Sequence, residues 1–144
     1  MKKFSLLLVI VVITISAISQ TQIPNSNFEN WTTVSGSDSI IGWNNAIYYN
    51  MGYPIGIIRI PTAKKESVEV FQGNFAAKLQ TQDFYDFQIP GLLQLGKLNV
   101  SGSDISLTGG IPFEDRPFGF SVFVKYFPAD DDTAFIAAYM TKYN

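Results

Sequence analysis

The stretch from residue 110 to residue 144 decides the fold class, and its sequence is GIPFEDRPFGFSVFVKYFPADDDTAFIAAYMTKYN. Apolar residues stand at every second position from Phe120 to Tyr126, which is the period of a β-strand. The five residues from Pro128 to Asp132 are poor strand formers, and a second strand-like run follows from Thr133 to Tyr143. The stretch therefore predicts a β-hairpin that the upstream part of the chain covers.

The register of this hairpin follows from the length of its loop. A five-residue loop pairs apolar residues on one face, with Val124 opposite Ile136, Val122 opposite Ala138 and Phe120 opposite Met140. A slip of one residue would mix the two faces, so the odd loop length is favoured. The other face carries Phe123, Lys125, Phe127, Phe135 and Tyr139. A strand face that only contacts water seldom carries so many aromatic residues, so this face is a candidate binding surface.

The N-terminus has the three-part pattern of a signal peptide. Lys2 and Lys3 precede an apolar run over residues 4–15. Ala17 and Ser19 stand at the two positions before the cleavage point that a signal peptidase recognises. The alternative, an uncleaved membrane anchor, is disfavoured because the run is shorter than the roughly 20 residues that span a bilayer. We expect residues 1–19 to be removed and residues 20–144 to form one exported domain, in the periplasm, at the cell surface or secreted.

Composition narrows the class of protein further. Loss of the signal peptide removes two of the ten basic residues and leaves twelve acidic ones, so a nucleic-acid or anionic-lipid partner is disfavoured. Cysteine is absent, which argues against a disulfide framework and a lipid anchor. The chain is rich in aromatic residues, with twelve Phe, seven Tyr and two Trp, and has few charges. These features predict a single all-β domain.

The remaining strands are expected in short runs separated by turns. We predict strands at residues 55–60, 67–71, 75–80, 92–100 and 101–109, with the Gly73-Asn74 turn joining the second and third into a hairpin. Loops or turns are expected at residues 34–38, 62–66 and 83–86, and most of residues 40–61 is expected to be an aromatic loop. Glycine and proline within that last segment exclude a helix there.

Five segments in this order match one family. They are IPNSNFENWT from residue 23, the Gly42-Trp43 pair, QGNFAAKLQT at 72–81, IPGLLQLG at 89–96 and GIPFEDRPFGFSVFVKYFP at 110–128. The chain resembles the Putative Carbohydrate Metabolism domain family, which comprises exported bacterial proteins with a jelly-roll fold related to carbohydrate-binding modules. The resemblance covers only the first part of that domain, because the family continues into further strands. It therefore implies a C-terminally truncated domain and an incomplete jelly-roll-like antiparallel β-sandwich.

The resemblance also implies a metal site. Related carbohydrate-binding sandwiches often hold a structural calcium ion between an N-terminal Phe-Glu pair and the last strand, and Phe28-Glu29 matches the first half of that site. The last strand is missing here, so the calcium site is expected to be incomplete. No other cofactor is expected.

Catalytic chemistry has little support in the sequence. Histidine and cysteine are both absent, which removes the usual nucleophilic triads and zinc ligand sets. A carboxylate pair acting on a glycosidic bond would have to come from Glu29, Glu114, Asp115 or residues 130–132. Except for Glu29, these acids stand in stretches typical of solvated turns. We expect a non-enzyme, with a carbohydrate-active enzyme as the weaker alternative.

Aromatic residues supply the positive evidence for binding. Sugar rings stack their C–H faces on tryptophan and tyrosine, while amides bond the hydroxyl groups. One such mixture contains Trp43, Tyr48, Tyr49 and Tyr53 with Asn44, Asn45 and Asn50, and the second contains Phe123 and Tyr139. The alternative is that these rings pack in the core. We therefore predict a non-catalytic, glycan-binding or surface-associated module, and alternatively a structural or adhesive protein with no glycan site. Separately, the open edge strand near Ile136 predicts self-association.

Overall fold

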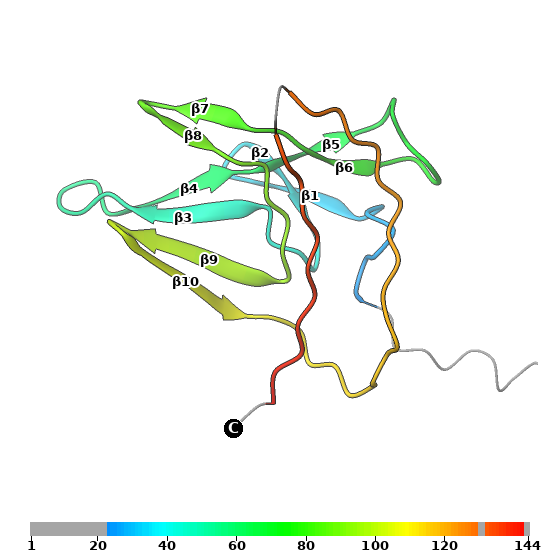
Figure 1. Ribbon diagram of the computed structural model, residues 1–144. Helices are drawn as coiled ribbons and strands as arrows, with labels where there is room; N and C mark the ends of the chain where they lie inside the picture. The colour runs from blue at the N-terminus through cyan, green and yellow to red at the C-terminus, as the bar shows by residue number, and fades with distance from the viewer. Residues whose placement is uncertain (1–22, 130–131, 143–144) are drawn as a thin grey trace, which may run out of the picture.

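The computed structural model describes residues 23–129 and 132–142, which form ten β-strands and no helix (Figure 1). The strands are β1 (Trp31–Val34), β2 (Ser37–Ile40), β3 (Ala46–Asn50), β4 (Ile57–Pro61), β5 (Ala63–Glu66), β6 (Ala76–Leu79), β7 (Gln82–Phe84), β8 (Phe87–Ile89), β9 (Gly96–Ser101) and β10 (Asp104–Gly109). The all-β prediction is confirmed. No helix long and apolar enough to cross a membrane occurs in these two ranges, and the predicted signal peptide lies outside them.

The largest sheet has four strands in the order β10-β9-β3-β4. Neighbours pair antiparallel except β3 and β9, which run parallel with Ile47 opposite Leu98. Three two-stranded sheets accompany it, formed by β1-β2, β5-β6 and β7-β8. The β1-β2 turn is Ser35-Gly36, and both residues have positive φ, as expected for the two-residue turn that fits the twist of a hairpin.

The register gives the four-stranded sheet two different faces, because residues directly opposite each other point to the same side. The apolar face carries Ile47, Tyr49, Ile58, Ile60, Leu98, Val100, Ile105 and Leu107. The polar face carries Tyr48, Arg59, Lys97, Asn99, Ser106 and Thr108. β3 and β4 form because isoleucine and tyrosine, which favour strands, occupy most of their positions.

The buried centre lies where β2, β3, β4 and β5 meet. Its apolar members are Ile40, Ala46, Ile47, Ile60 and Ala63, and the two buried polar residues are Asn45 and Thr62. The Thr62 hydroxyl donates to the Leu92 carbonyl over 2.7 Å, which ties the connection before β9 to the end of β4. This small core contrasts with the many large apolar side chains that remain exposed along the chain.

The predicted C-terminal hairpin is wrong. Residues 110–129 and 132–142 contain no strand, and the two segments run past the sheets without a ladder between them (Figure 1). The alternating residues do not form strands, and most of their large apolar side chains stay uncovered. Phe120, Val122 and Ile136 are all exposed, and an isolated two-stranded hairpin without burial is marginal in water.

Several upstream predictions also need correction. β6 confirms the strand expected at 75–80, but its partner is β5, in the predicted turn at 62–66, and residues 67–71 form no strand. The predicted linker at 34–38 and loop at 83–86 each contain the turn of a hairpin, β1-β2 and β7-β8. β3 lies inside the predicted aromatic loop, whereas β4, β9 and β10 fall close to the expected runs. Turn residues indicated where strands end. Which strands pair depended on contacts between segments that are distant in the sequence.

Candidate functional site

An open concavity of about 420 Å³ lies over the polar face of the four-stranded sheet. We call it the Tyr48 concavity. The side chains that matter for its chemistry are Trp43, Asn44, Tyr48, Arg59, Lys97 and Thr108. Val34 and Ser39 of the β1-β2 hairpin form a further part of its wall. The concavity therefore combines a strand face with the loop that precedes β3.

The N-terminal segment holds Trp43 at this site. Its indole Nε1 donates to the Pro24 carbonyl over 2.9 Å, and the Phe28 ring packs against it edge-on with 5.3 Å between ring centroids. Gly42 has a φ of 84° and lies so close to Pro24 that an added Cβ would stand 3.3 Å from the proline Cβ. The segment at residues 23–30 therefore fixes the tryptophan while leaving it half-buried.

Tyr48 stands near the middle of the polar face. It lies opposite Arg59 on β4 and opposite Asn99 on β9. The Lys97 ammonium sits over the Tyr48 ring, 4.0 Å from its centroid, in a cation–π contact. This contact keeps a positive charge at the concavity without neutralising it.

Asn45 supports the concavity from the buried centre. Its amide nitrogen donates to the carbonyls of Asp38 and Ala63 over 2.9 and 3.0 Å. Its amide oxygen accepts from the Arg59 guanidinium over 3.3 Å and from the Ser39 hydroxyl over 3.4 Å. One buried amide thus joins β2, β4 and β5 and orients the arginine.

The charges at the Tyr48 concavity are of one sign. Of the described residues that line it, Arg59 and Lys97 are basic and none is acidic. Ion pairs within residues 23–129 and 132–142 join Lys78 to Glu66 and Lys125 to Glu69, away from this site. The site can therefore offer hydrogen-bond donors and positive charge beside two aromatic rings.

No protein-family model, curated protein or solved structure matches this chain. The resemblance to the carbohydrate metabolism domain family stays a prediction.

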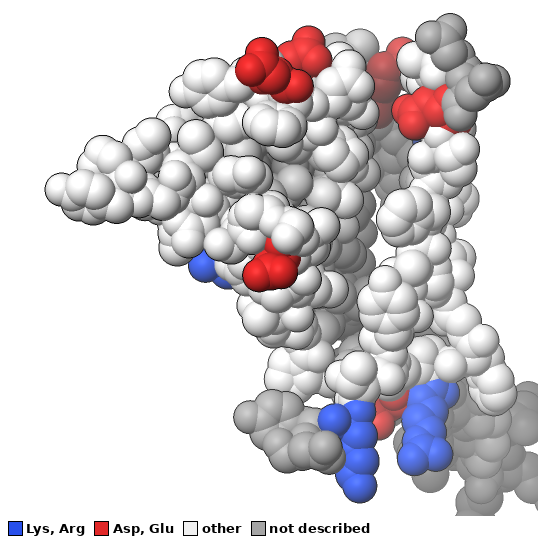
Figure 2. All heavy atoms as spheres, turned by 60° about the vertical axis from the view of Figure 1, so that its left-hand side comes forward, with Lys and Arg blue, Asp and Glu red and all other residues white. Residues whose placement is uncertain are grey.

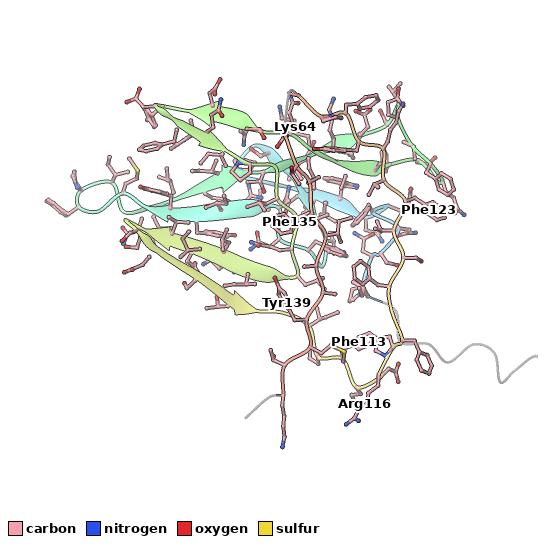
Figure 3. All side chains as sticks on the ribbon, in the orientation of Figure 1. Lys64, Phe113, Arg116, Phe123, Phe135 and Tyr139 are labelled. Atoms are coloured by element: carbon pink, nitrogen blue, oxygen red, sulfur yellow. The ribbon has the colours of Figure 1, made fainter. Side chains whose placement is uncertain are left out.

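The predicted ligand-binding residues divide between several places. Trp43 and Tyr48 come together at the concavity, whereas the register puts Tyr49 on the apolar face. Tyr53 is fully exposed in the β3-β4 connection. Figure 3 places Phe123 on one C-terminal segment and Tyr139 on the other. Of these two exposed side chains, Phe123 stacks on Phe71 with 3.9 Å between ring centroids.

Sequence reasoning missed the two cations of the site. Arg59 is the single charged residue in the run IIRIP at 57–61, and such a charge among isoleucines signals a side chain on the opposite face of the strand. Lys97 alternates with Leu98 in the same way along β9. Period-2 reading of these two runs could have found both residues, but it could not have placed them beside Tyr48.

Glu29, the predicted metal ligand, ties the N-terminal segment to residues 74 and 75. Its Oε1 accepts from the backbone amides of Asn74 and Phe75 over 2.8 and 3.1 Å, and its Oε2 accepts from the Asn74 side chain over 3.1 Å. The Phe75 and Asn74 amides favour the charged carboxylate, so they lower the pKa of Glu29. A Cβ on Gly73 would collide with this carboxylate at 2.2 Å, and the positive φ of Gly73 also favours glycine.

The other described candidate carboxylates form no metal-binding group with Glu29. Within the part of the chain that the structure describes, no group of three or more His, Cys, Asp or Glu residues could hold a metal ion. Glu114, Asp115 and Asp132 lie exposed in the C-terminal region, while Asp130 and Asp131 fall outside the described residues. The calcium site stays a prediction that gains no further ligand from these residues.

Proposed function

We propose that this chain is an exported, non-catalytic β-domain that binds glycans at the Tyr48 concavity. The observation that carries the proposal is the meeting of Trp43 and Tyr48 with Asn44 and Arg59 in one open hollow. Sites that bind small ligands usually combine aromatic rings with a few polar groups that point to the same place. The resemblance to carbohydrate-binding modules, and the jelly-roll-like sandwich it implies, agree with this proposal.

The chemistry of a sugar suits this arrangement. The C–H face of a pyranose ring packs on an indole or phenol ring, which removes apolar surface from water. Its hydroxyl groups then accept from the Arg59 guanidinium and exchange hydrogen bonds with the Asn44 amide and the Thr108 hydroxyl. The hollow is open to solvent, so it could bind a sugar unit in the middle of a polysaccharide and does not require a chain end. Binding requires no cofactor and no catalytic group.

Replacing Tyr48 with alanine is expected to weaken polysaccharide binding about tenfold, because the ring contributes contact area that no neighbour replaces. The matched control is Tyr53→Ala, since Tyr53 is fully exposed and lies outside the concavity. Binding is measured by retention on a panel of insoluble polysaccharides and on a glycan array, and folding by circular dichroism. Equal retention of both variants, or a folded wild-type chain that binds no glycan on either platform, would contradict the proposal.

Export is the second part of the proposal, and the N-terminal pattern supports it. In a bacterial host we expect the exported protein to begin at Gln20, after cleavage that follows Ser19. Intact-mass analysis of the periplasmic and culture fractions measures this directly. Recovery of a protein that retains Met1 in those fractions would show that cleavage does not occur.

A structural or adhesive protein is the second candidate, and one observation favours it. Large apolar side chains remain exposed on the β10 edge strand and along the C-terminal segments. Open strand edges and exposed apolar side chains promote pairing with another chain. The two candidates are compatible, because the Tyr48 concavity lies on the polar face and the exposed residues of β10 lie on the apolar face.

A further inference from the structure

We propose that the Tyr48 concavity selects acidic polysaccharides, and that Arg59 and Lys97 bind the carboxylate of a uronate unit while the aromatic residues contact its ring. This inference rests on the proposed glycan-binding function and goes further, because it names the class of glycan. A neutral sugar would use the rings and the hydrogen-bonding groups of the hollow, but it would leave the positive charges of Arg59 and Lys97 without an opposite charge. Two cations in a hollow without a lining carboxylate are suited to an anion.

Arg59 provides the first half of the anion site. It lies on the polar face of β4, directly opposite Tyr48. Its Nη2 donates to the buried Asn45 amide oxygen over 3.3 Å, which fixes the orientation of the guanidinium. A guanidinium has five N–H donors in a planar fork that matches a carboxylate, so this one bond leaves donors for a ligand.

Lys97 provides the second half from the neighbouring strand β9. Its ammonium rests on the Tyr48 ring rather than on a carboxylate, so its charge is held at the hollow and remains available. Lys97 and Arg59 flank Tyr48 from two strands, because Tyr48 on β3 pairs with both β4 and β9. A sugar that contacts the Tyr48 ring would therefore have a cation within reach of its acidic substituent.

The charge of the whole chain makes this arrangement selective. The exported chain, residues 20–144, has eight basic and twelve acidic residues, so its net negative charge disfavours the approach of polyanions. Attraction of an acidic polysaccharide must therefore come from a local site. Such attraction acts over short range, because physiological salt screens exposed charges beyond about 8 Å.

The test compares polygalacturonate, which has a carboxylate on each sugar, with its fully methyl-esterified form, which has the same backbone without the charge. The full chain is expected to bind polygalacturonate about tenfold more tightly, in keeping with the contribution of charged hydrogen bonds. Lys97→Gln and Arg59→Gln should each weaken binding to polygalacturonate by a much larger factor than binding to the ester, and so remove most of that preference. Arg59→Gln should also weaken binding to the ester somewhat, because Arg59 donates to neutral hydroxyl groups as well. Arg59→Lys should retain part of the preference, because the charge remains but the fork is lost.

Lys64→Gln is the matched control, because Lys64 is an exposed strand lysine on β5 that does not line the concavity (Figure 3). It should change neither affinity by more than about twofold, as is usual for an exposed charge. Thermal unfolding of each variant, followed by circular dichroism, verifies that the fold is retained.

The outcomes separate the two levels of the proposal. Equal binding of both polymers with no effect of Lys97→Gln overturns the acidic preference and leaves glycan binding in place. An equal loss on both polymers also overturns it, because Lys97 would then act only by positioning Tyr48. If the folded chain binds neither polymer and no sugar on a glycan array, the proposed function fails together with this inference.

Discussion

Replacing Asn45 with alanine is expected to lower the free energy of unfolding by about 3 kcal/mol, because it leaves buried backbone groups without partners. Asn45 is fully buried, and its amide nitrogen is hydrogen-bonded to the carbonyls of Asp38 and Ala63. Truncation leaves both carbonyls facing a cavity and also removes the acceptor for Arg59. We expect an earlier midpoint in urea unfolding followed by tryptophan fluorescence.

Asn50→Ala provides the comparison at the other end of β3, since Asn45 directly precedes that strand and Asn50 ends it. Asn50 is exposed at the end of β3, and its side-chain oxygen accepts one hydrogen bond from the Gly52 amide over 3.0 Å. Water can replace this bond, so the loss of stability should stay below about 1 kcal/mol. If the two variants unfolded at the same urea concentration, the central role of the Asn45 amide would be refuted.

Self-association of the chain is the second large effect that we expect. Few apolar side chains are buried, whereas Ile105 and Leu107 on the outermost strand β10 are 71% and 54% exposed. Each large apolar side chain left in water forgoes about 1.5 to 3 kcal/mol of burial. Residues other than Lys, Arg, Asp and Glu also cover most of the described surface seen in Figure 2, so few charges on this face oppose association. Sedimentation velocity should show species larger than a monomer that increase with protein concentration.

Charges on β10 test where this association occurs. Ile105→Lys combined with Leu107→Lys should shift the chain to the monomer, because lysine on an edge strand opposes both burial and strand pairing. Ser106→Lys puts a lysine on the same strand but on the polar face, so it separates loss of the apolar face from general charging of the edge. A wild-type chain that stays monomeric and unfolds in one cooperative transition would refute the prediction.

The sequence contained enough information for the fold class but not for the strand partners. Aromatic and β-branched runs with turn residues between them predicted an all-β domain, and the strands β4, β6, β9 and β10 arose near the expected runs. Periodicity reports which side chains share a face, but not which strand lies next to it. The C-terminal alternation therefore predicted a hairpin that does not form, because periodicity gives no information about what a segment packs against.

The candidate site was predictable only in part for a related reason. Trp43 and Tyr48 could be chosen from their residue types, since aromatic residues near asparagines are a recognisable combination. Tyr49 could not be separated from Tyr48 until β3 was known to be a strand, because alternation sends neighbours to opposite faces. Lys97 required the β3-β9 pairing, which joins segments distant in the sequence.

That parallel pairing also constrains the order in which the chain can fold. β3 and β9 are separated by the whole segment from β4 to β8, so their ladder closes a long loop and raises the contact order of the domain. The hairpins β3-β4 and β9-β10 are local and can form early, each with one edge still open. Joining them is the non-local step, and we therefore expect it to be the slow one. Until it occurs, Tyr48 and Lys97 belong to separate folding units, so the concavity comes into existence only with the last contacts of the sheet.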